Sequence, residues 1–293
     1  MSTPTPAGLV VVDKPAEMTS HDVVARVRRL AGTRKVGHAG TLDPMATGVL
    51  LLGVNRATRL LGHLMLTEKA YDAVVRLGVA TTTDDAEGEA VARTPASGLT
   101  DERIREAFSG QVGDIEQVPS SVSAIKVDGK RAYARVRAGE SVELKARPVT
   151  VHEIAVGDVD RHDDVVDVTI SVRCSSGTYV RAIARDVGAA LGVGGHLTAL
   201  RRTSVGPFTL DDARTLDELD EDLVVVPIAE VARRCFPSRT LGDADAASVL
   251  VGRKLDVDLG GPGPVAVFDE AGEFLALYEQ RGPVAAAVAV FAS

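Results

Sequence analysis

The chain has 293 residues, a net charge of −8, 45% hydrophobic residues and only 3% aromatic residues. This length and apolar content predict one large domain, or a large domain with a small one. The longest apolar stretches fall far short of the roughly 20 residues that a membrane span needs, and the N-terminus lacks the pattern of a signal peptide. Cys174 and Cys235 fit neither a disulfide framework nor a metal-ligand spacing, so we expect a cytoplasmic protein without a metal site.

The first part of the chain mixes apolar strands with short helices. The predicted elements are a buried strand at 8–14, a helix at 20–32, a glycine-rich loop at 37–48, a strand at 48–54, a short helix at 55–65 and a half-buried strand at 70–79. Ser20 is expected to cap the first helix, because Val23, Val24 and Val27 begin its apolar stripe.

The middle of the chain predicts a polar, mobile segment followed by strands. Residues 81–91 are mobile by composition, and the elements that follow are a capped helix at 100–110, strand and basic loop at 115–140, strands at 149–159 and 164–175, and a helix at 177–192. Since helices and strands do not alternate regularly, we expect an α+β fold with a mixed or antiparallel central sheet flanked by helices and loops.

The texture of the chain changes after an acidic segment at 211–222. Short β-like runs between glycine and proline turns fill the remainder, and residues 263–279 predict a hairpin. We therefore expect two domains, a large one at 1–236 and a small β-rich one at 237–293.

Charge is distributed unevenly along the chain. Residues 120–147 hold seven bases and three acids, and residues 173–202 hold five bases and one acid. The acidic segment at 211–222 holds seven acids and one base. Such separation allows a basic face to bind a polyanion although the whole chain is acidic, but ordinary solvated charge would give the same pattern.

Asp43 stands in the glycine-rich loop GHAGTLDPMATG, directly before a buried strand. An aspartate before proline often only shapes a turn. However, Gly37, Gly40 and Gly48 allow close approach of a ligand, and His38 adds a second polar group. A single rigidly held carboxylate could act as a nucleophile or a general base. No second carboxylate stands near it in the sequence, although the fold could supply one.

A second candidate segment is SSGTYVRAIARD. Ser175, Ser176 and Thr178 are expected to cap a helix whose free N–H groups favour an anion. Tyr179 could lie under a base, with Arg181 two residues later; a plain capped helix is the alternative. Elsewhere, Tyr71 could belong to the core, and Lys14 and Lys126 beside turns could be solvated. No phosphate loop or dinucleotide fingerprint occurs.

Together these segments resemble the bacterial tRNA pseudouridine synthase B family. The resemblance rests on five blocks in the family's order between Gly8 and about Phe208: GLVVVDKPAEMTSHDVV, KVGHAGTLDPMATGVLLLGVNRATRL, KAYDAVVRLGVATTTDDAEGE, VPSSVSAIKVDGKRAYARVRAGE and CSSGTYVRAIARDVGAALGVGGHLTALRRTSVGPF. It implies isomerisation of the T-loop uridine at tRNA position 55 to pseudouridine, with no cofactor, metal or guide RNA. The expected partner is the T-arm stem-loop of tRNA, and we expect a monomer.

The resemblance also implies roles for individual residues. The catalytic aspartate falls on Asp43, and Arg181 pairs with it. The substrate-binding positions fall on Lys14, His38, Tyr71, Tyr179, Arg181 and Leu200. Because the uracil base must leave its stack to react, we expect base flipping. We expect phosphate contacts from the basic residues near Lys126–Arg137 and from Arg201 and Arg202. Arg181 is expected to keep the pKa of Asp43 low.

The sequence departs from the family at two places, and it leaves open both the reaction route and two alternative functions. Glu17 stands where the family usually has glycine, and the segment after Pro237 matches the family's small RNA-binding β-barrel only weakly. Asp43 could attack C1′ or C6, or it could abstract the C2′ proton. The alternative functions are an RNA chaperone that opens the T-loop, with catalysis secondary, and a carboxylate-dependent glycosidase, which would need a second catalytic carboxylate.

Overall fold

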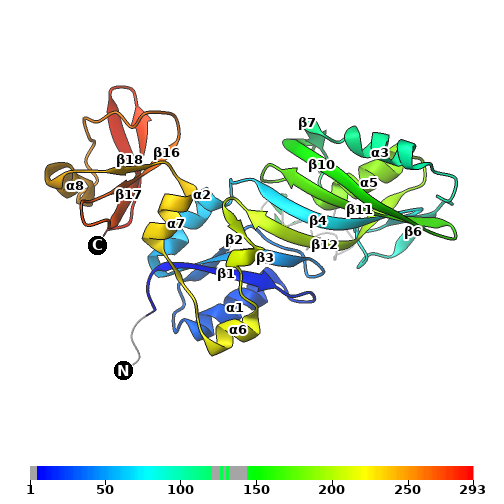
Figure 1. Cartoon of the computed structure of the whole chain (residues 1–293), viewed down its shortest axis with the longest axis horizontal. Helices are drawn as coiled ribbons and strands as arrows, with labels where there is room; N and C mark the ends of the chain where they lie inside the picture. The colour runs from blue at the N-terminus through cyan, green and yellow to red at the C-terminus, as the bar shows by residue number, and fades with distance from the viewer. Residues whose placement is uncertain (1–4, 121–125, 128–129, 132–143, 293) are drawn as a thin grey trace.

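The computed structural model describes residues 5–120, 126–127, 130–131 and 144–292. A ten-stranded mixed sheet forms its centre (Figure 1). The strand order is β14 (Val226–Pro227), β1 (Gly8–Lys14), β3 (Thr47–Val54), β12 (Gly195–Val205), β4 (Lys69–Leu77), β11 (Val165–Cys174), β10 (Arg147–His162) and β7 (Gly113–Gln117), with β2 (Val36–Ala39) on β3 and β13 (Phe208–Thr209) on β12. The predicted α+β fold with a mixed central sheet is confirmed.

Two antiparallel halves make up this sheet, and one short parallel contact joins them. Strand β12 pairs with β3 only at Arg201–Thr47 and Arg202–Gly48. Gly48 has a φ of +98°, and a side chain there would collide with the backbone of Arg202. Glycine is required at this position because it alone tolerates both the backbone conformation and the close approach. The junction places the loop before β3 beside the end of β12.

Helices and short hairpins surround the sheet. They are α1 (Ser20–Leu30), η1 (Asn55–Leu60), α2 (Leu61–Leu64), β5 (Val79–Thr81), β6 (Ala90–Arg93), α3 (Asp101–Ser109), β8 (Lys126–Val127), β9 (Lys130–Arg131), α5 (Val180–Ala190), η2 (Leu210–Asp212), α6 (Leu216–Glu221) and α7 (Ile228–Cys235). Helices α3 and α5 lie together against the half that contains β4, β10 and β12, whereas α1, α6 and α7 lie at the half that contains β1 (Figure 1).

Two local predictions for the first part of the chain were wrong. Thr19, not Ser20, caps α1: its side chain accepts a hydrogen bond from the backbone N–H of Asp22, and the Asp22 carboxylate accepts one from the backbone N–H of Thr19. Such a capping box provides acceptors for two backbone N–H groups at the start of the helix. Ser20 is instead the first helical residue and is buried. The glycine-rich loop is also shorter than predicted, because residues 36–39 pair with β3 as strand β2.

The C-terminal segment forms a second sheet, as its β-like pattern predicts. Its strands are β15 (Ser238–Thr240), β16 (Pro264–Phe268), β17 (Phe274–Arg281) and β18 (Val284–Val290). The β16–β17 hairpin is confirmed, whereas helix α8 (Asp243–Leu250) was not expected.

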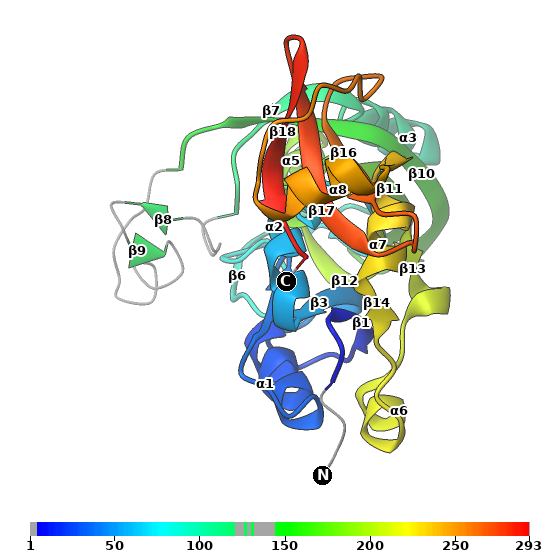
Figure 2. The same ribbon diagram turned by 90° about the vertical axis from the view of Figure 1, so that its left-hand side faces the viewer.

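Aromatic side chains connect this second sheet to the central one. Phe268, Phe274 and Phe291 belong to a buried cluster that includes apolar residues of β1, β3 and α7. The two sheets therefore share one hydrophobic core, and Figure 2 shows the C-terminal strands rising from the region of α2 and α7. Within the described ranges, no helix is long and apolar enough to cross a membrane.

Candidate active site

A pocket of about 270 Å³ lies where the two halves of the sheet meet. Five of the seven residues to which the resemblance gives a role at the site line it, namely Asp43, Tyr71, Tyr179, Arg181 and Leu200. They come from the β2–β3 loop, from β4, from the start of α5 and from β12. The fold therefore brings together groups that are as much as 157 positions apart in the chain, counted from Asp43 to Leu200.

Buried side chains fix the backbone on both sides of Asp43. Ser20 accepts a hydrogen bond from the N–H of Leu42 at 2.9 Å and donates one to its carbonyl at 3.1 Å. On the other side, Lys14 Nζ donates to the carbonyl of Pro44 at 3.2 Å. Because this loop is tied to β1 and α1, the Asp43 carboxylate is held in place before any ligand arrives.

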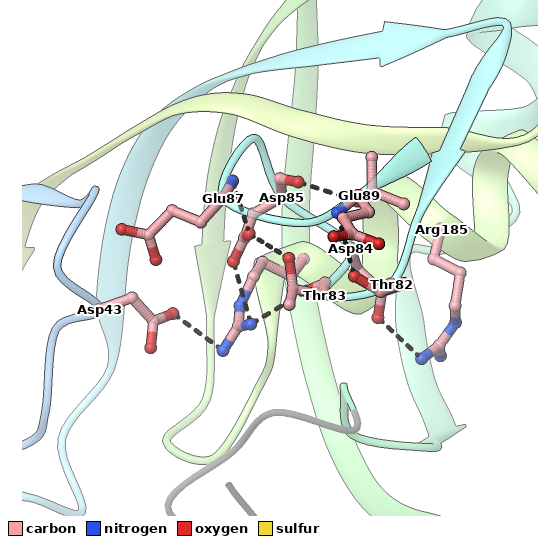
Figure 3. Close-up of polar contacts among 10 residues, drawn as sticks. Asp43, Thr82, Thr83, Asp84, Asp85, Glu87, Glu89 and Arg185 are labelled. Carbon is pink, nitrogen blue, oxygen red and sulfur yellow. Dashed lines mark hydrogen bonds and ion pairs between the residues drawn. The ribbon is translucent and has the colours of Figure 1, made fainter. Parts of the chain in front are cut away.

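Arg181 pairs with Asp43 from the opposite wall of the pocket. The Arg181 side chain is 4% exposed, and its Nη2 lies 3.0 Å from Asp43 Oδ2. Its Nη1 lies 3.0 Å from Asp85 Oδ2 and donates to the carbonyl of Thr83 at 3.0 Å. Figure 3 shows the carboxylates of Asp43 and Asp85, each at the end of a dashed contact. One buried cation thus joins two carboxylates.

Asp85 is a residue of this site that the sequence interpretation missed. The segment at 81–91 was expected to be mobile, but Asp85 is only 1% exposed. Its carboxylate accepts hydrogen bonds from Thr83 Oγ1 and from the backbone N–H of Glu87, which fold the segment into a tight turn. Aspartate commonly stabilises a turn in this way. The side chain also provides the second carboxylate that no neighbouring sequence position supplied.

The pKa of Asp43 shifts in the direction opposite to the one expected. Burial raises the pKa of this carboxyl, and the charge of Arg181 opposes the increase without overcoming it. Asp85 raises the pKa of Asp43 further, whereas Lys14 lowers it. The sequence suggested the cationic partner, but it did not show that the carboxyl would be desolvated or that a second carboxylate would stand beside it.

Tyr71 and its neighbours form the floor of the pocket. Tyr71 is 8% exposed, and burial raises the pKa of its hydroxyl while the nearby Arg202 opposes this. Arg202 is 1% exposed and donates through Nε to the carbonyl of Val49 at 2.7 Å. Arg202 thus holds the sheet junction, and its contact with phosphate stays a prediction. Arg201 pairs with Asp13 at 2.7 Å.

Tyr179 is positioned by a pair of hydrogen bonds from β7. Its backbone N–H donates to Gln117 Oε1 at 2.8 Å, and Gln117 Nε2 donates to its carbonyl at 3.1 Å. The predicted caps of α5 were wrong, because the N-cap residue is Tyr179, whose own side chain makes no capping hydrogen bond. Ser175 Oγ instead accepts a hydrogen bond from the N–H of Thr150. Tyr179 thus enters the pocket from a braced backbone.

Lys14 and His38 lie near the pocket but do not line it. Lys14 is fully buried, and Nζ also donates to the carbonyls of Pro15 and Met18; burial lowers its pKa to about 8. It is not the solvated lysine that its position beside a turn suggested. His38 lies in β2 opposite Leu52 and meets the ring of His21 edge to face at 5.5 Å.

Glu17 adopts the conformation that glycine favours. Its φ is +65°, and its N–H donates to the carbonyl of Pro44 at 2.9 Å. The left-handed conformation costs a non-glycine residue about 1–2 kcal/mol. The loop contact to the residue after Asp43 is therefore made despite this substitution.

The structure describes only part of the predicted basic face. The side chains of Lys126, Lys130 and Arg131 and the whole of Arg135 and Arg137 lie outside the described residues. Within the described part of the chain, no group of three or more His, Cys, Asp or Glu side chains could hold a metal ion.

Comparison with known proteins assigns the family. Residues 28–180 match the model of the TruB family pseudouridylate synthase N-terminal domain. Residues 181–230 match the tRNA pseudouridylate synthase B C-terminal domain, and residues 236–292 match the C-terminal domain of tRNA pseudouridine synthase II. The chain belongs to the TruB family of pseudouridylate synthases.

Individual members of the TruB family are similar over nearly the whole chain. A tRNA pseudouridine synthase B of Streptomyces griseus is 58% identical, covering 99% of this chain and 99% of that protein. One of Nocardia farcinica is 59% identical, covering 97% and 92% respectively. Among solved structures, a Cbf5–Nop10–Gar1 complex contains a chain with a TM-score of 0.73 and 25% identity, covering 97% of this chain and 85% of that one.

Proposed function

We propose that this chain converts one uridine in the T-loop of tRNA, at position 55, to pseudouridine, without a guide RNA or a cofactor. Support comes from the relatives named tRNA pseudouridine synthase B and from the five sequence blocks that resemble that family. The reaction exchanges the C1′–N1 bond for a C1′–C5 bond with no net oxidation or reduction. Acid–base and nucleophilic groups are therefore enough for it.

The observation that carries the proposal is the Asp43–Arg181 contact of 3.0 Å inside the pocket. A carboxylate with a fixed cationic partner on a braced loop is suited to attack the sugar or the base, or to abstract a proton. Asp43 keeps 36% of its side chain exposed, so its carboxylate stays open to a ligand. We assign Asp43 as the catalytic residue.

The other pocket residues are proposed to bind the extruded uridine. Extrusion costs a few kcal/mol, which new contacts must offset. Tyr71 offers a ring face, and Tyr179 and Leu200 add apolar surface around it. We propose that Lys14 acts through the Asp43 loop and not on the RNA directly, because Nζ is engaged by three carbonyl oxygens. His38 is proposed to contact RNA outside the pocket.

The two-domain division at 236/237 is also a proposal. Residues 237–293 hold four bases and eight acids, so we expect this part to contribute little phosphate binding of its own. The monomeric state and the cytoplasmic location remain predictions.

Tritium release provides a direct test. A T-arm stem-loop transcript labelled with tritium at C5 of uridine loses the label when C5 bonds to C1′. We expect release by the wild-type chain with no cofactor added, and none by Asp43→Asn, which should bind the RNA nearly as well. Turnover by Asp43→Asn near the wild-type rate would refute the role of Asp43. Binding and refolding of tRNA without any release by the wild type would favour the chaperone alternative.

A further inference from the structure

Two exposed apolar side chains stand at the edge of the pocket. Nine large apolar side chains are exposed among the residues that the structure describes, and Met65 is the one that lines the pocket. Leu66 follows it directly, and the two side chains are 46% and 74% exposed. Adjacent exposed apolar residues beside a pocket are typical of a contact surface for a ligand.

The turn that carries these residues is held rigidly. Lys69, only 7% exposed, donates from Nζ to the carbonyls of Met65 and Thr67 at 2.9 and 2.7 Å. Thr67 Oγ1 donates to the carbonyl of Leu64 at 2.8 Å, and the N–H of Gly206 donates to the carbonyl of Glu68 at 2.9 Å. Burial of the lysine lowers its pKa to about 8, so placing a cation there has a cost. The turn is thus fixed with both apolar side chains outward.

We propose, resting on the proposed function, that Met65 and Leu66 form an apolar platform for the base next to the extruded uridine. When one base leaves a stack, the faces of its neighbours lose their contact and become exposed to water. An aliphatic surface at the mouth of the pocket can cover such a face. A phosphate would not favour this surface, because the one cation of the turn already donates to two carbonyl oxygens.

The test measures the coupling between this platform and a neighbouring base. Leu66→Asn and Met65→Gln are compared with the wild type for the Kd and kcat of an intact T-arm stem-loop. The same measurements use two synthetic stem-loops, each with an abasic nucleotide on one side of the target uridine. We expect Kd to rise about fivefold for each variant on intact RNA, as partial loss of apolar contact predicts. On the abasic RNA that lacks the base covered by the platform, the variants and the wild type should bind with equal Kd.

Val91→Asn serves as the control, because Val91 is 63% exposed on β6 and does not line the pocket. We expect its Kd to be that of the wild type on all three RNAs. An unchanged Kd for both platform variants on intact RNA would overturn the proposal, and so would a deficit that persists on both abasic RNAs. Failure of the proposed function is a separate outcome, because the wild type would then release no tritium. The Kd comparison would still show whether the platform contacts a neighbouring base.

Discussion

Removing the charge of Asp85 tests the network behind Asp43, the proposed catalytic residue. Asp85→Asn keeps the size of the side chain but only one of its two oxygens. Asp85 Oδ1 accepts hydrogen bonds from Thr83 and Glu87, and Oδ2 lies 3.0 Å from Arg181 Nη1, so either the turn or Arg181 loses its acceptor. A hydrogen bond to a charged group contributes about 1.5–3 kcal/mol, against about 1 kcal/mol for a neutral one. Breaking a buried pair outright costs about 3–5 kcal/mol. We therefore expect a loss of about 2–3 kcal/mol in the free energy of unfolding.

For a chain of this length, that loss corresponds to a decrease of about 3–5 °C in Tm. Asp101→Asn is the matched control, because Asp101 pairs with Arg161 at 2.6 Å but is 49% exposed. An exposed pair contributes little to stability because solvent screens it, so its Tm should change by no more than about 2 °C. Equal Tm values for the two variants would refute the argument that Asp85 stabilises a buried cation.

The same variant has a second, independent readout. Asp85 raises the pKa of Asp43, and Arg181 lowers it. Without the Asp85 charge, the pKa of Asp43 is no longer raised by Asp85 and is still lowered by Arg181, so the ionised form of Asp43 is favoured. We expect kcat to fall, because Arg181 loses one of the groups that orient it, and the acid limb of the kcat profile to move to lower pH. A shift of that limb to higher pH would contradict the assignment of the limb to Asp43.

Four further predictions concern the same site and its support. Lys14→Met should lower kcat and move the acid limb to higher pH, because Lys14 lowers the pKa of Asp43; an unmoved limb would count against this contact. Asp43→Asn should keep or raise Tm at pH 7, because the pKa of Asp43 is higher in the folded chain than in the unfolded chain. The ionised carboxyl therefore lowers stability at pH values above its folded pKa, and this loss is absent at pH values below its unfolded pKa. Tyr71→Phe should fold, because the ring is kept, and should turn over more slowly; an unchanged kcat would limit Tyr71 to stacking. A chain ending at Phe236 should show a lower Tm and less soluble protein than the full chain, since it loses the three phenylalanines of the shared core; equal Tm values would show that the central domain is stable alone.

Sequence patterns carried the elements that depend on local periodicity. The alternation in β4 and the apolar stripe of α1 gave their positions correctly, because a strand and a helix each repeat with a fixed period. The capping residue of α1 was misplaced by one position, since Thr19 and Ser20 are both good caps and only the backbone geometry distinguishes them.

The sequence by itself determined the family, because the motif around Asp43 and the blocks around Tyr71 and Arg181 are specific, and it predicted these three residues, which line one pocket in the structure. The tertiary structure alone showed that Asp85 shares Arg181 with Asp43 and that Lys14, Ser20 and Arg202 are buried supports. The reason is physical: burial raises the pKa of Asp43 and lowers that of Lys14, and burial depends on contacts between segments far apart in the chain. A local sequence pattern does not show which charged side chains such contacts bury.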